Sequence, residues 1–372
     1  MKNYIYLDNN ATTQLDKKVL KTMLIDLKGP PYNPSSIHAF GRKALSLLIE
    51  SKKKIASLLK IYPDEIVFTS GGTEAVNLLI NGIYKKGHII TTDIEHQCVY
   101  NTLLNFQKKG TPVSFLKTGL LGKVTPKQIK EAIREDTSLI ILSAVNSETG
   151  IKIDMEEISE IAYEKNISFI IDAVQLLGKS FFTIKKSMTG LAFSGHKIHG
   201  PKGIGFAYIK KNSNITPLII GGKQENNLRA GTENLSGILG LTKAIELSYT
   251  NLTKNIKKIK RLRDHFENFL VKKLNISIIG EDRICNVSNM IFKDVEAEDM
   301  LILLDQKKIL ASHGSACAAG SISRVLLNMG IKREIARSAI RFSFSRFNTF
   351  KEIKKAEKEI IRIYKKLLLF KK

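Results

Sequence analysis

The sequence predicts an α/β protein whose mainly parallel sheet is covered by helices on both faces. From about residue 64 onward, short apolar runs alternate with amphipathic stretches, and residues 138–143 and 167–172 are near-continuous apolar runs. Strands of this composition are buried on both faces, as in parallel sheets. The length of 372 residues exceeds what one hydrophobic core usually organises, so a large and a small domain are expected.

The large domain, expected over residues 15–253, alternates strands with helices. Each expected strand is a short aliphatic or aromatic run, and the intervening helices carry apolar residues on one face. The expected strands are residues 65–69, 88–92, 138–143, 167–172, 191–194 and 203–209, and helices follow from residues 74 and 96. This alternation is typical of crossover connections between parallel strands.

A different pattern begins after residue 253 and predicts a smaller α+β domain. This domain is expected to comprise residues 254–372 together with residues 1–14. Its expected elements are a long amphipathic helix, short strands near 276–279 and 287–292, a helix over 297–304 and a last helix from about residue 350.

The charge and the cysteine content narrow the possible functions. Lys and Arg total 59 against 35 acids, a formal charge of +24. The basic residues are spread along the solvated faces of helices, so nucleic-acid binding is not expected as the main function. No apolar run approaches the roughly 20 residues that span a membrane, and no signal peptide is expected. Three cysteines without a CxxC pair argue against a disulfide framework or a zinc knuckle and favour the reducing cytoplasm.

Two charged residues stand at the ends of expected strands. Lys197 follows an apolar strand and precedes a glycine-rich turn, where a partly desolvated amine could form a Schiff base. By itself it is better interpreted as a surface lysine before a turn. Asp172 ends another strand, at the edge where parallel sheets bind ligands, and a pyridinium N–H would be a suitable partner. The simpler alternative is an Asp that caps a helix.

A third feature is the glycine-containing turn at residues 70–74. It joins a strand to a helix, so unpaired backbone N–H groups and the positive end of the helix dipole could hold a phosphate. The alternative is an ordinary helix start with Thr73 as N-cap. Together, the three features suggest one ligand that has a phosphate, a ring nitrogen and an aldehyde.

These motifs and others make the chain similar to a known family. It resembles the cysteine desulfurases of the NifS/IscS type, which are class V aminotransferases with the fold of the PLP-dependent transferases (fold type I). The matching segments are residues 6–13, 33–42, 68–74, 95–96, 194–197, 229–234, 314–317 and 340–343. The resemblance covers nearly the whole chain.

The resemblance implies pyridoxal 5'-phosphate (PLP) as cofactor and assigns residues to hold it. Lys197 would bind the aldehyde, Asp172 the pyridine nitrogen and Gln175 the ring oxygen. The residues implied around the phosphate are Gly72, Thr73, Ser194 and His196, with Thr232 reaching it from the other subunit of a homodimer. No metal is implied.

The resemblance also implies L-cysteine as substrate and alanine as product. Lys197 would remove the α-proton, His96 would stack on the ring and move protons, and Arg341 would bind the substrate carboxylate. Cys317 would attack the substrate sulfur and become a persulfide. Its setting among small residues makes the alternative, a buried apolar thiol, less fitting than for Cys98 and Cys285.

Some positions depart from the family pattern. Ser147 replaces a usual Asn that touches cofactor or substrate, and a hydroxyl reaches less far. His313 stands where Ser or Thr is usual, and is interpreted as a solvated loop residue with a proton shuttle as the alternative. The loop after Cys317 is shorter than the family's longer form. The resemblance implies an iron–sulfur scaffold or another sulfur-acceptor protein as partner. Because the reach of this loop sets which acceptor the persulfide can meet, the sequence does not identify which.

Other functions remain open at this stage. A selenocysteine lyase or a small-amino-acid aminotransferase would use the same fold, although an aminotransferase would not need Cys317. A basic binding protein without chemistry is a third alternative. It would have no use for Lys197, Asp172, His96 and Arg341 together with a thiol.

Overall fold

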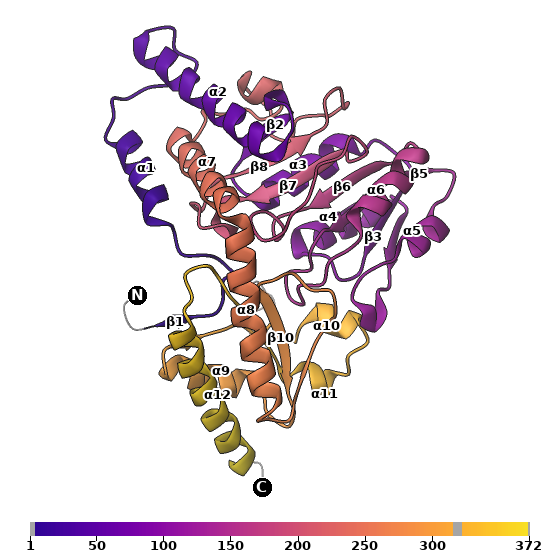
Figure 1. The fold of residues 1–372 in the computed structure, drawn as a ribbon. Helices are drawn as coiled ribbons and strands as arrows, with labels where there is room; N and C mark the ends of the chain where they lie inside the picture. Colours follow the sequence, from indigo (N-terminus) through magenta and orange to yellow (C-terminus); the bar gives the residue numbers. More distant parts are fainter. Residues whose placement is uncertain (1–3, 315–321, 371–372) are drawn as a thin grey trace.

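A computed structural model describes residues 4–314 and 322–370 of the chain as two packed parts, each with its own sheet (Figure 1). The larger sheet has seven strands in the order β2-β8-β7-β6-β5-β3-β4. Their bounds are β2 (Ile66–Thr69), β3 (His88–Thr92), β4 (Val113–Leu116), β5 (Thr137–Ser143), β6 (Ser168–Asp172), β7 (Gly190–Ser194) and β8 (Gly205–Ile209). The fold class predicted from the sequence is therefore confirmed.

The sheet is mainly, but not wholly, parallel. Strands β3 to β7 pair in parallel, whereas β8 runs antiparallel to both β7 and β2. The connection from β7 to β8, residues 195–204, contains only a 3-10 turn and no crossover helix, so the chain must reverse its direction. The edge strand β4 was not expected, because all its residues are only partly buried and its apolar pattern is correspondingly weak.

Helices cover both faces of this sheet, as the apolar strands require. One face of the sheet packs against α3 (Gly72–Ile83) and α4 (Gln97–Lys108). Alternate residues of the same strands point to the opposite face, where they pack in a second hydrophobic cluster that includes residues of helix α6. The other helices of this part are α1 (Lys17–Leu27), α2 (Ala39–Leu59), α5 (Pro126–Ala132), α6 (Met155–Glu164) and α7 (Leu235–Thr250). Apart from β4, the strands themselves are almost completely buried.

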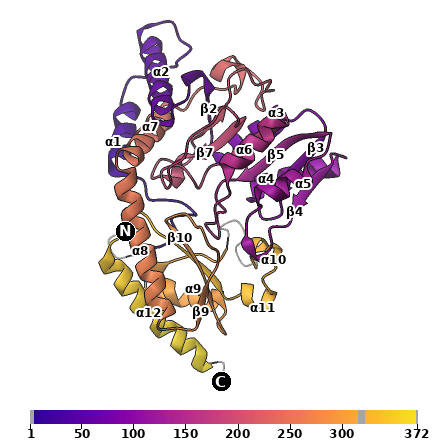
Figure 2. The same ribbon diagram turned by 45° about the vertical axis from the view of Figure 1, so that its right-hand side comes forward.

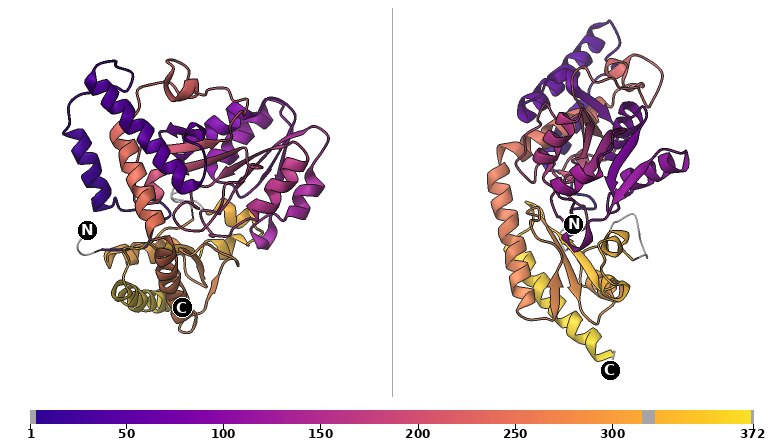
Figure 3. Two further views of the ribbon diagram at one scale, coloured as in Figure 1. Left: turned by 45° about the horizontal axis from the view of Figure 1, so that its top comes forward. Right: turned by 90° about the vertical axis from the view of Figure 1, so that its right-hand side faces the viewer.

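The smaller part is built on an antiparallel sheet in the order β12-β10-β9. Helices α8 and α12 lie along one side of it, with α10 and α11 on the other (Figure 2). Its elements are α8 (Leu252–Val271), β9 (Ile276–Ile278), β10 (Val287–Phe292), α9 (Ala297–Gln306), β11 (Ile309–Leu310), α10 (Arg324–Asn328), α11 (Arg333–Ala336), β12 (Ala339–Ser343) and α12 (Phe350–Phe370). Helix α8 follows α7 after a break at Asn251 and leads the chain from one part to the other (Figure 3).

The N-terminal segment packs with the smaller part. Strand β1 (Ile5–Tyr6) pairs in parallel with β11, and Ile5 and Leu7 belong to the same hydrophobic cluster as Phe266. The larger sheet lies in separate clusters. On this basis we propose the division into residues 15–253 and residues 1–14 plus 254–372. No helix in the described part of the chain has the length and apolarity needed to cross a membrane.

Replacing Phe266 tests the core of the smaller part. Its side chain is 0% exposed and makes edge-on contacts with Phe342 at 5.0 Å and Phe344 at 5.4 Å between ring centroids. We expect Phe266→Ala to lower the free energy of unfolding by about 3–5 kcal/mol in urea titrations, because it leaves a cavity. The matched control Phe181→Ala, at a side chain that is 66% exposed, should change it by less than about 1 kcal/mol. Equal losses would contradict the assignment of the core.

Candidate active site

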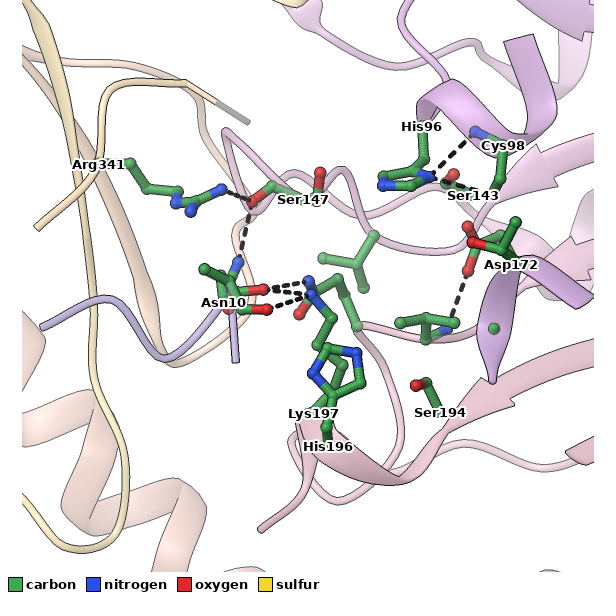
Figure 4. Close-up of a pocket in the computed structure, with 16 residues that line it drawn as sticks. Asn10, His96, Cys98, Ser143, Ser147, Asp172, Ser194, His196, Lys197 and Arg341 are labelled. Atoms are coloured by element: carbon green, nitrogen blue, oxygen red, sulfur yellow. Dashed lines mark hydrogen bonds between the residues drawn. The ribbon is translucent and has the colours of Figure 1, made fainter. Parts of the chain in front are cut away.

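A cavity of about 240 Å³ opens at one edge of the large sheet (Figure 4). Ser143, Asp172 and Ser194 line it, and each is the last residue of its strand, β5, β6 and β7. Residues from the N-terminal segment and Arg341 of β12 complete the wall. Ligand sites of open α/β sheets lie at the carboxyl ends of the strands, so the position of the cavity itself favours a ligand.

Asp172 supplies a buried negative charge to this cavity. Its Oδ1 accepts a hydrogen bond from the backbone N–H of Val174 at 3.0 Å, and the side chain is almost inaccessible to solvent. Burial raises the pKa of Asp172, while His96 and Lys197 nearby partly oppose this effect. A carboxylate in such a place is stabilised by a cationic partner. The protonated pyridine nitrogen of PLP fits that requirement.

Lys197 lies between Arg341 on one side of the pocket and Asp172 on the other (Figure 4). It follows β7 in a 3-10 turn, Gly195–Lys197. Its Nζ donates to the carbonyl oxygen of Asn10 at 2.6 Å and to that of Ala11 at 3.0 Å. These two carbonyls hold the amine at the centre of the cavity, where an aldehyde carbon of a bound ligand could be reached.

The start of helix α3 forms an open cradle beside Ser194. The helix begins at Gly72 with Gly71 as N-cap, and no side chain caps its first N–H groups. Thr73 is therefore not the N-cap, in contrast to the simpler alternative from the sequence. A Cβ at Gly72 would lie 2.6 Å from Cγ2 of Val174, so only glycine keeps this space open. Uncapped N–H groups at a helix start suit a phosphate.

His196 belongs to the same end of the cavity. Burial, together with the nearby Lys197 and Lys202, lowers the pKa of His196 to about 4, so the imidazole is neutral at physiological pH. Its Nδ1 lies 3.1 Å from the hydroxyl of Thr12. A neutral imidazole offers a hydrogen bond to a phosphate oxygen without adding a full charge.

His96 is the N-cap of α4, and its ring points into the pocket (Figure 4). The backbone N–H of Cys98 donates to its Nδ1 at 3.2 Å, which places the proton of the neutral ring on Nε2. Burial lowers the pKa of His96 and so favours this neutral form. The position suits a ring that stacks on a planar cofactor.

Cys98 lies closer to the site than the sequence indicated. It was expected to be a structural thiol, but it lines the cavity with its Sγ 3.0 Å from Nδ1 of His96. Ligand atoms of His96, Cys98 and Asp172 lie within 4.8 Å of one another, as a metal site would require. Burial and the charge of Asp172 raise the pKa of the Cys98 thiol strongly, which opposes the thiolate that a metal binds. We therefore assign no metal to these residues.

Arg341 enters the cavity from the smaller part of the molecule. Its guanidinium is buried and donates to Oδ1 of Asp8 at 2.9 Å and to the carbonyl oxygen of Ser147 at 3.1 Å. Its Nε has no hydrogen-bond partner in the described part of the chain. A buried guanidinium with an unused donor suits a small carboxylate.

The remaining predicted residues are not all in the pocket. Gln175 and Ser147 line it. Thr232 is exposed and does not line it, which leaves its expected role toward a partner subunit as a prediction. Cys317 lies outside the described residues. His313 is only partly exposed, and its Nδ1 lies 2.8 Å from the carbonyl oxygen of Ala339, so it is bound to the smaller sheet rather than solvated.

Sequence reasoning missed Asn10, which connects several parts of the site. Its carbonyl oxygen accepts from Lys197 and from Nε2 of Gln175 at 3.1 Å, and its Nδ2 donates to the carbonyl oxygen of Ser147 at 3.0 Å. Asn286 donates to its Oδ1 at 2.8 Å. Asn10 lies in segment 6–13, which matches the family pattern. Contacts made by its backbone carbonyl do not depend on residue type or spacing, so the sequence did not single it out.

Glu95 is a second residue whose position the sequence did not reveal. It is buried beside the ends of β3 and β5, and it accepts from the backbone N–H of Ser143 at 2.8 Å and from the hydroxyl of Thr92 at 2.6 Å. Burial raises its pKa to about 7. These hydrogen bonds therefore hold Ser143, at the end of β5, against the segment that leads into α4 at His96.

Known proteins share both this sequence and this fold. The model of the aminotransferase class-V family matches residues 5–356. The chain is 39% identical to the cysteine desulfurase IscS of Dictyoglomus turgidum, over 99% of this chain and 96% of that protein. It is also 39% identical to the cysteine desulfurase IscS of Methanosarcina thermophila, over 98% and 92%. A solved NifS-like protein matches with a TM-score of 0.92 and 34% identity, covering 98% of this chain and 100% of that one. The chain therefore belongs to the aminotransferase class-V family and, within it, to the cysteine desulfurases of the NifS/IscS type.

Proposed function

We propose that this protein is a PLP-dependent cysteine desulfurase that removes sulfur from L-cysteine and releases L-alanine. The observation that carries this function is the convergence of Lys197, Asp172 and Arg341 on one cavity, in a chain of the cysteine desulfurase family. These side chains offer an amine for the cofactor's aldehyde, a carboxylate for its ring nitrogen and a guanidinium for the carboxylate of an amino acid.

We assign the chain's own groups to the steps around the substrate. When bound, PLP supplies an electron-withdrawing ring that takes up the electron pair released at the α-carbon. Arg341 holds the substrate carboxylate, and its unused Nε and buried setting support this role. The amine of Lys197 takes the α-proton, and the neutral imidazole of His96 lies against the ring and exchanges a proton through Nε2. Ser147 contributes through its backbone carbonyl, which orients Arg341.

Gln175 and the cradle at α3 complete the proposed cofactor site. We assign Gln175 to the ring oxygen, because its amide lines the cavity near Lys197. Phosphate binding is assigned to the uncapped start of α3 and the residues opposite it. These residues are Gly72, Thr73, Ser194 and His196.

Sulfur transfer is assigned to Cys317 on the strength of the family match. Its thiolate attacks the substrate sulfur, the bond between that sulfur and the β-carbon breaks, and the sulfur stays on Cys317 as a persulfide. The electron pair of the broken bond remains with carbon and is protonated, which yields the methyl group of alanine. The persulfide sulfur then passes to an acceptor protein, for which we propose an iron–sulfur scaffold in the cytoplasm.

A homodimer is also part of the proposal. Large apolar side chains are exposed on helices α1 and α2 and on the loop before Thr232, including Ile25, Phe40 and Ile220, which is 85% exposed. Several large apolar side chains exposed on neighbouring stretches of the chain support a subunit interface. Thr232 is exposed in the same region of the chain, as a residue serving the partner's phosphate site should be.

The activity itself is tested by measuring alanine and sulfide from L-cysteine with added PLP and a thiol reductant. We expect the two products in equal amounts. Cys317→Ala should lose at least about 100-fold in sulfide release yet retain PLP, because it removes the nucleophile but no cofactor contact. The control Cys285→Ala should keep activity within a few-fold, since that thiol is buried away from the cavity.

Different outcomes would favour the other functions. Full activity of Cys317→Ala would refute the nucleophile assignment. Transamination of L-alanine without sulfide would favour an aminotransferase. A rate with L-selenocysteine far above that with L-cysteine would favour a selenocysteine lyase.

Replacing Asp172 should change the affinity for PLP and the stability of the cofactor-free protein in opposite directions. Burial raises the pKa of Asp172, so the folded protein holds this proton more tightly than the unfolded chain and loses stability as pH rises above about 4. Asp172→Asn should therefore make the cofactor-free protein more stable at pH 8 in urea titrations, while its affinity for PLP falls at least about tenfold.

The exposed Asp136→Asn should change neither quantity and serves as the control. If Asp172→Asn bound PLP as tightly as the native protein does, the assignment of Asp172 to the ring nitrogen would be wrong.

A further inference from the structure

Lys179 is a lysine inside the protein, behind the wall of the active-site cavity. It is 8% exposed and follows Asp172 and Gln175 in the turns after β6. Its Nζ donates to Oε1 of Gln175 at 2.6 Å, a short hydrogen bond between two buried side chains. In the described part of the chain, Lys179 takes part in none of the ion pairs.

This placement costs free energy, because a buried amine loses its hydration. Burial, together with the nearby positive charges of Lys197 and Arg341, lowers the pKa of Lys179 to about 7. The Cys285 thiol opposes this shift, but it donates its hydrogen bond to the backbone carbonyl of Lys179 and not to the amine. Ordinary lysines remain in water, where the charge is solvated.

The hydrogen bonds to Lys179 and Asn10 together decide which way the Gln175 amide points. The amine of Lys179 donates to the amide, so it faces the amide oxygen and not the amide nitrogen. Nε2 is then directed to the opposite side, where it donates to the carbonyl oxygen of Asn10 at 3.1 Å at the edge of the cavity. Without Lys179, only the hydrogen bond to Asn10 would oppose a half-turn of the amide, which would present an oxygen to the cavity instead of a donor.

We propose that Lys179 is a positioning residue that locks the Gln175 amide so that its N–H donor faces the ring oxygen of bound PLP. This inference rests on the proposed contact between Gln175 and that oxygen. The donor, polarised by the hydrogen bond from the Lys179 amine behind it, stabilises negative charge on the ring oxygen. The nitrogen of Lys197, once joined to the cofactor, then holds its proton less tightly.

The readout is the pH midpoint of the visible absorbance of bound PLP, which reports the proton on the Lys197 linkage. Gln175→Leu removes the donor and should raise this midpoint by about one pH unit, the scale of one charge-assisted hydrogen bond. Lys179→Met should raise it by at least half as much and weaken PLP binding several-fold. The exposed Lys186→Met is the matched control and should change neither quantity.

A double variant distinguishes orientation from general packing. Because Lys179 acts through Gln175, Lys179→Met should add no further shift in the Gln175→Leu background. Lys179→Gln, which restores an uncharged N–H donor, should shift the midpoint less than Lys179→Met does, and it serves as the second variant if Lys179→Met does not fold.

Each contrary outcome overturns a different statement. No shift in Gln175→Leu would refute the contact of Gln175 with the ring oxygen, while the desulfurase activity would stand or fall on the alanine assay. A shift in Gln175→Leu with none in Lys179→Met or Lys179→Gln would refute the role of Lys179. Fully additive shifts in the double variant would refute it as well, because they would mean that Lys179 acts independently of Gln175.

Discussion

The parallel pairing of β5, β6 and β7 is the constraint on which the site depends. Ser143 pairs with Asp172 across β5 and β6, and Asp172 pairs with Ala192 across β6 and β7. Because parallel strands end at the same edge, the polar residues that terminate them are brought to one place. The apolar residues before them are buried between the two helical layers, so a slip of one residue would move each side chain to the wrong face.

A second constraint is the crossing of the N-terminal segment between the two parts of the molecule. Leu7 packs in the core of the smaller part, while the carbonyls of Asn10 and Ala11 receive Lys197 in the larger part. Asp8 holds Arg341 in between. The amine that we assign to the cofactor and the guanidinium that we assign to the substrate are thus held by one short stretch of chain. A displacement of either part would alter both groups together.

The cavity is surrounded by buried ionisable groups whose pKa values are shifted by desolvation. Burial raises the pKa of Asp172 and Glu95 and lowers the pKa of His96 and Lys179. Such groups reduce the stability of the protein without ligand, and a bound cofactor offers partners for them. Strongly shifted pKa values gathered around one cavity are typical of catalytic sites, whereas Glu357 is shifted at a distance from it, in helix α12.

The sequence by itself determined the fold class, the position of most elements and the residues at the strand ends. Apolar runs and periodicity depend on burial, so β5 and β6 were found within one residue at each end, whereas the half-buried edge strand β4 was missed. Local motifs also pointed to Asp172, Lys197 and the start of α3. Only the tertiary structure decided that β8 runs antiparallel, that Cys98 faces the cavity and that Asn10 and Lys179 support it. These features arise from contacts between residues far apart in the chain or from the direction of a side chain, and neither leaves a periodic pattern in the sequence.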